Sequence, residues 1–336
     1  MKNYSINFLI NYYSFIYFYF YIFIYLEMKK KTNFIKCKKK NEKLKDIIQI
    51  CILKNLDFIY FNGGFLYYCD FKTLKRAFGK QLFISIHNIC LINDSQILCS
   101  HSRNQFSLIS IMNNKDFNID KTIIVEDNIP IETFYSIELK DKNILSYSIN
   151  KMKIYDMKNY QNITSILFPF EIMNIYEIEI TNELLLTYKN SIINFLNMNL
   201  FIFSSNPIEI KYIYKYSQNI CQITKKLICI GYKNGFALIN IFNHSIINKI
   251  NVSYLNITNV IKISPELFII RSEPQHKLVS TSLIFFYKIN NENNECIQIH
   301  KDLIDSEIKS INYLSSNLLL IISTDALKII EFELNI

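Results

Sequence analysis

The chain has 336 residues, half of them hydrophobic, and a formal net charge of +8 at pH 7. Its length is sufficient for a large core, and its 5 Gly and 5 Pro argue against a disordered or collagen-like chain. The 23 Tyr, the 26 Phe and the abundant Ile, Asn and Lys indicate a bias towards A/T-rich codons. Lysine and asparagine patterns therefore carry less information here than in an average protein.

Residues 4–26 form an uncharged segment dominated by Tyr and Phe. A helix of this length would reach across a bilayer, for which about 20 apolar residues suffice. Tyrosine, however, prefers the membrane interface to the bilayer centre, and no small-residue cleavage site follows. Three interpretations of residues 1–28 stay open: a membrane anchor, an apolar element packed on the rest of the protein, or a translated leader upstream of a true start at Met28.

A lysine-rich segment, residues 29–45, follows. Seven of its lysines lie between positions 29 and 40 with no acid among them. Without them the chain is close to neutral, which argues against a broad nucleic-acid-binding surface. The cluster is interpreted either as a contact for phosphate or anionic lipid or as a solvent-exposed basic tail.

A paired-strand unit recurs seven times in residues 46–336. Each unit has an apolar run, a short polar turn and a second apolar run, as in DFIYF-NGG-FLYYCD at residues 57–70. The units begin 39 to 51 residues apart, at Asp57, Gln96, Asn143, Glu183, Lys226, Glu266 and Asn317. Further apolar runs before and after each pair supply a first and a fourth strand. This period predicts an all-β, seven-bladed β-propeller.

The end of the chain predicts how the ring closes. The seventh unit finishes at Ile336 with no residues for a fourth strand, which would leave an open sheet edge. We therefore predict that an N-terminal strand at residues 32–38 (TNFIKCK) completes the last blade. Asn62-Gly63-Gly64 and Asn234-Gly235 are predicted to form tight hairpin turns, because both residue types tolerate positive φ.

The repeats resemble degenerate WD40 repeats across residues 47–336. The family often ends its third strand with Trp-Asp, and the matching positions here are Cys69-Asp70, Tyr155-Asp156, Phe242-Asn243 and Tyr287-Lys288. The family's Gly-His is missing, and only Asp325 matches its turn aspartate. The resemblance implies a scaffold for protein–protein interaction in a multiprotein complex. Because most of the family's motif residues are missing, their hydrogen-bond network is expected to be largely absent and the ring to be held together by packing alone.

No catalytic set is visible in the sequence. The eight cysteines lie mostly in apolar runs without a CxxC pair, which favours a reducing, cytoplasmic location. The five histidines lack metal-ligand spacing, and His101 is flanked only by Ser100 and Ser102, whose adjacency rarely gives a productive nucleophile and base. We predict that the protein is not an enzyme and that it uses no cofactor and no metal.

Two surfaces are candidate binding sites. The first is a basic strip, whose members are Lys36, Lys38, Lys39, Lys40, Lys72, Lys75, Arg76 and Lys80. It suits anionic lipid or acidic peptide, although outer strands commonly carry such charges. The second is the longest polar loop, at residues 271–282, with Arg271, Glu273, Gln275, His276 and Lys277 as candidate contacts.

The sequence thus predicts a non-catalytic propeller that docks other proteins in the cytosol. The alternative is a membrane-associated propeller, anchored by residues 4–26 or bound to anionic lipid through basic residues 29–40 and 72–80. The Phe-Arg-Arg-Gly motif of phosphoinositide-binding propellers is absent, which argues against a lipid-specific version. The sequence identifies neither the partner nor the oligomeric state.

Overall fold

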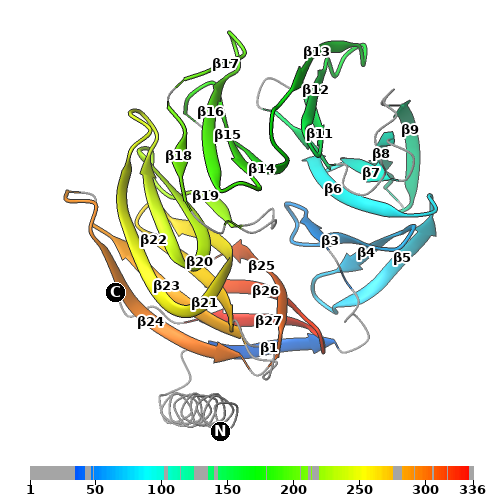
Figure 1. Cartoon of the computed structure of the whole chain (residues 1–336). Coiled ribbons are helices and arrows are strands. Elements are labelled where there is room, and N and C mark those ends of the chain that lie inside the picture. The colour runs from blue at the N-terminus through cyan, green and yellow to red at the C-terminus, as the bar shows by residue number, and fades with distance from the viewer. Residues whose placement is uncertain are drawn as a thin grey trace, which may run out of the picture.

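Antiparallel sheets arranged as a ring make up the protein, as the computed structural model shows (Figure 1). The structure describes residues 35–41, 47, 49–101, 105–113, 115–124, 135–139, 143–178, 180–204, 206–210, 213, 219–274, 282–290, 292–304, 306–315 and 317–332. Within these ranges the strands form six hydrogen-bonded sheets. The predicted all-β propeller is therefore confirmed.

Three sheets each contain four strands that are consecutive in the chain. The first has β2 (Ile50–Ile52), β3 (Phe58–Asn62), β4 (Phe65–Asp70) and β5 (Lys75–Gln81). The second has β6 (Ile86–Asn93), β7 (Gln96–His101), β8 (Gln105–Ile111) and β9 (Phe117–Ile124). The third has β10 (Tyr135–Glu138), β11 (Ile144–Ser148), β12 (Lys151–Tyr155) and β13 (Asn162–Leu167).

The remaining sheets differ in size. One has β14 (Ile172–Glu177), β15 (Glu183–Tyr188) and β16 (Ile192–Asn197), whose edge is covered by β17 (Ile202–Phe203) and β18 (Ile208–Glu209). The six-stranded sheet has β19 (Ile220–Gln222), β20 (Leu227–Asn240), β21 (Ile246–Ser264), β22 (Leu267–Pro274), β23 (Ser282–Ile289) and β24 (Cys296–Ile304). The last has β25 (Ile308–Ser315), β26 (Leu318–Ser323), β27 (Leu327–Phe332) and β1 (Ile35–Asn41).

Burial follows the position of a strand within its sheet. All six residues of the central strand β15 are buried, because the sheet is covered on both faces. The outermost strand β13 has no buried residue, and exposed and half-buried positions alternate from Ile163 onwards. This pattern explains why the inner strands read as continuous apolar runs in the sequence.

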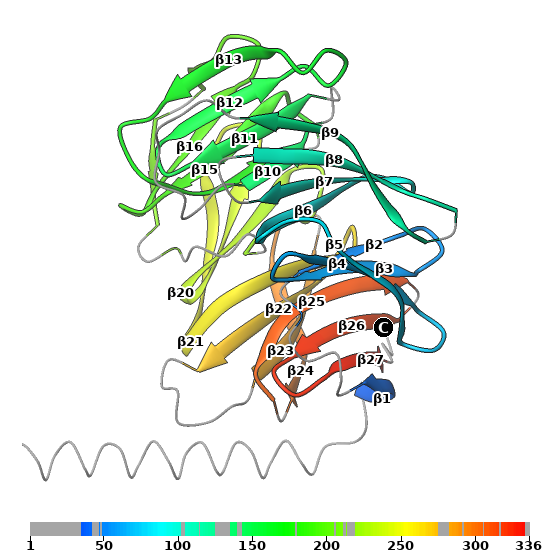
Figure 2. The same ribbon diagram turned by 90° about the vertical axis from the view of Figure 1, so that its right-hand side faces the viewer.

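The N-terminal strand closes the ring as predicted. β1 pairs antiparallel with β27, with Ile35 opposite Phe332 and Cys37 opposite Ile330, although it begins three residues later than expected. Figure 2 shows β1 at the outer edge of the sheet that contains β27, β26 and β25. A buried cluster with Phe58 and Tyr60 on one side and Leu320 on the other joins this last sheet to the first.

An ion pair adds to this closure. Asp325, in the turn between β26 and β27, lies 3.7 Å from the Nζ atom of Lys40 on β1 and 3.1 Å from that of Lys328. Partial burial opposes ionisation of Asp325, but hydrogen bonds from Ser323 and Lys328 and the charge of Lys328 outweigh it. Together they lower the pKa of this carboxyl group to about 2.

The sequence predicted seven blades, whereas the described residues form six hydrogen-bonded sheets, because β19–β24 are joined into one sheet. The first part of β21 pairs with β20, and its second part pairs with β22. Residues 246–264 contain no Gly or Pro to interrupt the strand, so it runs on from one repeat into the next.

Strand β20 nevertheless reverses direction within its length. Asn234 has a φ of 70°, as the predicted Asn-Gly turn requires. The Ile241 amide donates a hydrogen bond of 2.9 Å to the Lys226 carbonyl, which a straight strand would hold roughly 45 Å away. The chain therefore folds back at Asn234 and Gly235.

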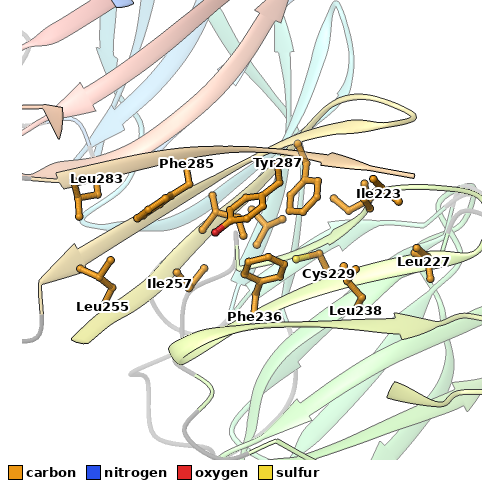
Figure 3. Packing of buried hydrophobic residues seen from close by; sticks show 14 residues of the cluster. Ile223, Leu227, Cys229, Phe236, Leu238, Leu255, Ile257, Leu283, Phe285 and Tyr287 are labelled. Atoms are coloured by element: carbon orange, nitrogen blue, oxygen red, sulfur yellow. The ribbon is translucent and has the colours of Figure 1, made fainter. Parts of the chain in front are cut away.

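The two halves of this sheet pack face to face. Figure 3 shows Phe236 of β20 pointing at Tyr287 of β23, with ring centroids 4.9 Å apart and planes inclined by 68°. Phe268 of β22 meets Phe236 edge-on at 5.8 Å. Burial of each of these aromatic side chains stabilises the fold by about 1.5–3 kcal/mol. The cluster therefore holds the two halves of the sheet together.

The turns that follow the third strands share one backbone geometry. This geometry shows that two of the family positions assigned from the resemblance were wrong. In five turns the side chain of an Asp or Asn accepts a backbone N–H two or three residues later: Asp70, Asp156, Asn197, Asn240 and Asn290. The residue four positions further on has positive φ in each of these turns. Asn240 and Asn290, rather than Asn243 and Lys288, therefore occupy the family's aspartate position.

The positive-φ residues of these turns also connect neighbouring sheets. The Nε2 atom of His244 lies 3.1 Å from Glu183 Oε2 at the start of β15, and both side chains are almost fully buried. The His244 ring stacks on Phe195 at 4.0 Å. Lys115, at the corresponding place after β8, lies 3.8 Å from Asp57 at the start of the preceding sheet's second strand.

Candidate functional site

The predicted basic strip falls on two outermost strands. Lys75, Arg76 and Lys80 lie on β5, and Lys72 lies in the exposed turn before it. Residues 36 and 38–40 lie on β1, the outermost strand of the last sheet. The first and last sheets adjoin through their shared buried cluster, so the structure brings both groups to neighbouring outer edges.

Several of these basic groups are engaged within the protein. The Arg76 guanidinium stacks 3.8 Å from the centroid of the Tyr67 ring and donates to the Tyr60 hydroxyl at 3.1 Å. Lys80 pairs with Asp116 at 3.2 Å and donates to the Phe117 carbonyl at 2.7 Å. The Arg76 contacts connect β5 to other strands of its own sheet, and the Lys80 contacts connect it to the second sheet. Binding of an external anion by the basic strip stays a prediction.

The predicted binding loop is shorter than expected, because its first residues belong to β22. Arg271 is only 3% exposed and donates to Asn259 Oδ1 at 2.7 Å and to the Lys309 carbonyl at 3.0 Å. It also contacts Glu273. Arg271 thus connects the first strands of two neighbouring repeats. Residues 275–277, which include Gln275, His276 and Lys277, lie outside the described residues.

The histidines make contacts that sequence proximity did not indicate. His101 Nε2 lies 2.9 Å from Ser107 Oγ on the next strand, whereas Ser100 is buried and residue 102 lies outside the described residues. Ser107 is fully buried. This pair therefore cannot present its hydroxyl to a substrate. Within the described ranges, no cluster of three or more His, Cys, Asp or Glu is placed to hold a metal ion.

Shifted pKa values occur together on β24 without forming an acid–base couple. Burial lowers the pKa of the Lys301 amine. Burial also raises the pKa of the Asp302 carboxyl, against the opposing effects of the Leu303 amide and of His300. Lys301 and Asp302 are adjacent in a strand, so their side chains leave opposite faces of the sheet.

One hollow in the described surface has mixed polar and apolar walls. It has a volume of about 440 Å³, is open to solvent, and lies between residues 81–84 and strands β7, β8 and β9. Its lining comprises Gln81, Leu82, Phe83, Ile84, His101, Gln105 and Thr122. Sequence reasoning missed this pocket because its walls come from two repeats, and no motif marks such a junction.

An apolar run stands out on the sheet formed by β14–β18. Leu200, Phe201, Ile202 and Phe203 are consecutive, and each is between 37% and 66% exposed. They span the turn after β16 and the two-residue strand β17. Consecutive exposed apolar residues are unfavourable in a soluble protein unless something covers them.

No helix among the described residues combines the length and the apolar character needed to cross a membrane. The uncharged segment at residues 4–26 lies outside those residues.

Comparison with known proteins identifies the fold. No protein-family model matches the sequence, and no curated protein matches it in sequence. The β-propeller domain of Cps50 (Swd1) from Myceliophteria thermophila has a TM-score of 0.67 at 8% identity, over 89% of this chain and 100% of that one. The structure of U3-55K has a TM-score of 0.68 at 7% sequence identity, over 89% of this chain and 98% of that one.

The WD40 repeats of RRP9 are a third match, with a TM-score of 0.67 at 8% identity, over 89% of this chain and 97% of that one. The chain therefore has the fold of a WD40-type β-propeller, as its repeats predicted. At such low identity the likeness establishes the fold alone.

Proposed function

We propose that the protein is a non-catalytic WD40-like propeller that serves as a docking scaffold for other proteins in a multiprotein complex. The observation that carries this proposal is the run of exposed apolar side chains from Leu200 to Phe203. Contiguous exposed apolar surface marks protein contact sites. The turn and the short edge strand that display it are held by the ring of sheets, an arrangement that suits binding.

A capture experiment tests this proposal. The intact protein, tagged at its C-terminus in its native cell, is captured beside a Leu200→Asp/Ile202→Asp variant and an Ile297→Asp control on the exposed face of β24. We expect reproducible partners for the wild type and the control, with at least one partner lost from the double variant. Absence of any reproducible partner, or identical partners for all three proteins, contradicts the proposal.

We further propose that the ring has seven blades, with β19–β24 counting as two. The reversal of β20 at Asn234 and the face-to-face packing of Phe236 against Tyr287 support this division. In this interpretation β21 is the outer strand of one blade and continues into the inner strand of the next.

The proposed location is the cytosol, with a membrane-tethered propeller as the second candidate. The position of β1 and β5 on neighbouring outer edges favours a common basic rim. Flotation with vesicles that contain phosphatidylserine tests the electrostatic version. Flotation that persists unchanged when Lys36, Lys38, Lys39 and Lys40 are all replaced by Gln contradicts it.

A further inference from the structure

A chain of hydrogen-bonded side chains runs along the wall of the pocket between residues 81–84 and strands β7–β9. His101 is 3% exposed, and its ring stacks on Phe83 with centroids 3.7 Å apart. Its Nε2 atom lies 2.9 Å from Ser107 Oγ, which lies 2.8 Å from Thr122 Oγ1. This chain of hydrogen bonds therefore begins at a buried imidazole and ends at the hydroxyl of Thr122, an exposed residue that lines the pocket.

These hydrogen bonds allow the hydroxyl of Thr122 to act towards a ligand either as a donor or as an acceptor. When His101 Nε2 accepts the Ser107 proton, Ser107 accepts from Thr122, whose oxygen then accepts from a ligand. When His101 Nε2 carries the proton, the direction reverses and the Thr122 hydroxyl donates outward. A hydroxyl can take either role, and an imidazole tautomer sets the direction.

The remaining walls indicate an uncharged ligand. Apart from the imidazole of His101, none of the seven lining side chains is ionisable. An ionised ligand would lose hydration without meeting a fixed counter-charge from these seven described residues, which is costly. The carboxamides of Gln81 and Gln105 each offer a donor and an acceptor, which match a peptide C=O and N–H. Ile84, 75% exposed, adds an apolar contact at the rim.

We propose that this pocket binds an uncharged peptide segment of a partner protein. An apolar side chain of the segment packs on Phe83 and Ile84, and its backbone amides pair with Gln81, Gln105 and Thr122. The volume of about 440 Å³ lies in the range of ligand sites. This inference rests on the proposed docking function and assigns it a second site, separate from the apolar run at residues 200–203.

The test uses a displayed library of random 12-residue peptides, selected on the intact wild-type protein. The affinities of enriched peptides are then measured by fluorescence polarisation for Ile84→Asp, Thr122→Val and a control, Leu167→Asp, whose side chain is 72% exposed on β13. We expect peptides without net charge, at least tenfold weaker binding to Ile84→Asp, a loss of a few fold with Thr122→Val, and an unchanged Kd for the control. Melting curves verify that all three variants fold.

Three results overturn the inference: no enriched peptide, enrichment of charged peptides, or equal binding by Ile84→Asp and the wild type. Each would leave the docking proposal standing if cellular partners still depend on Leu200 and Ile202. The opposite result is also distinguishable. If the capture experiment gives no reproducible partner while peptides still bind in a pocket-dependent way, the scaffold proposal is contradicted and the peptide-binding pocket is supported.

Discussion

A disulfide across the closing strand tests how the ring is sealed. The register of β1 and β27 places Cys37 directly opposite Ile330. Directly opposed residues of antiparallel strands have Cβ atoms roughly 4.5–5.5 Å apart, within reach of a disulfide after small adjustments. The variant Ile330→Cys should therefore form, under mild oxidation, a disulfide between Cys37 and the introduced cysteine.

The expected stabilisation is large because the bond spans almost the whole chain. A closed loop of about 290 residues gives roughly 5–6 kcal/mol in the chain-entropy model, and native strain reduces measured values to about 2–4 kcal/mol. At about 2 °C per kcal/mol for a chain of this size, the oxidised variant should melt roughly 4–8 °C above its reduced form. Comparing oxidised with reduced protein cancels the cost of removing the buried Ile330 side chain.

Peptide mapping by mass spectrometry and thermal unfolding with and without reductant are the assays. Cys37→Ser in the same background should abolish the shift. Ile329→Cys, opposite Lys39 and directed to the other face of the sheet, is the register control. Failure of Cys37 to crosslink to the cysteine introduced at position 330, or a crosslink from position 329 instead, refutes the assigned register and the closure argued from it.

Four further outcomes are expected. A protein that begins at Met28 should melt like the full chain, whereas one that begins at residue 42 lacks β1 and should melt lower and aggregate, as scanning calorimetry and light scattering would record. Replacing Glu183 by Ala removes the partner of buried His244 and should cost about 1–3 kcal/mol in urea unfolding, with Gln less harmful; an unchanged midpoint contradicts the inter-sheet role. The lowered pKa of Asp325, about 2, stabilises the fold above the ordinary carboxyl pKa, and this contribution disappears as pH falls from about 4 to 2. Because that side chain is 43% exposed, wild type and Asp325→Asn should differ by at most about 1 kcal/mol at pH 7 and converge near pH 2. Burial raises the pKa of Cys296 to about 12, so it should react far more slowly than glutathione with a thiol reagent at pH 8, and a fast reaction contradicts its assigned environment.

Features that depend on residues close together in the sequence were predictable, whereas those that depend on distant residues were not. Hairpin turns depend on a few neighbouring residues, and Asn234-Gly235 formed the turn expected of it. The turn geometry at Asp70 and Asp156 is equally local, and both matched the family position assigned to them. The family's aspartate position was assigned to Asn243, three residues after Asn240, because the degenerate repeat offers two asparagines. Both side chains accept a backbone N–H two residues later, and the positive φ of His244, four residues after Asn240, distinguishes them.

The sequence by itself determined the all-β ring, because paired apolar runs recur along the chain at a nearly constant repeat length. It also predicted the closing strand, and the pairing of β1 with β27 confirms that prediction. Only the tertiary structure decided what happens between repeats. Arg271 looked like a loop residue until its contacts with Asn259 and Lys309 placed it in the interior. The pocket at His101 likewise needs residues 81–84 from one repeat and Thr122 from the next. Such contacts depend on how sheets stack around the ring, and neither local propensity nor periodicity contains that information.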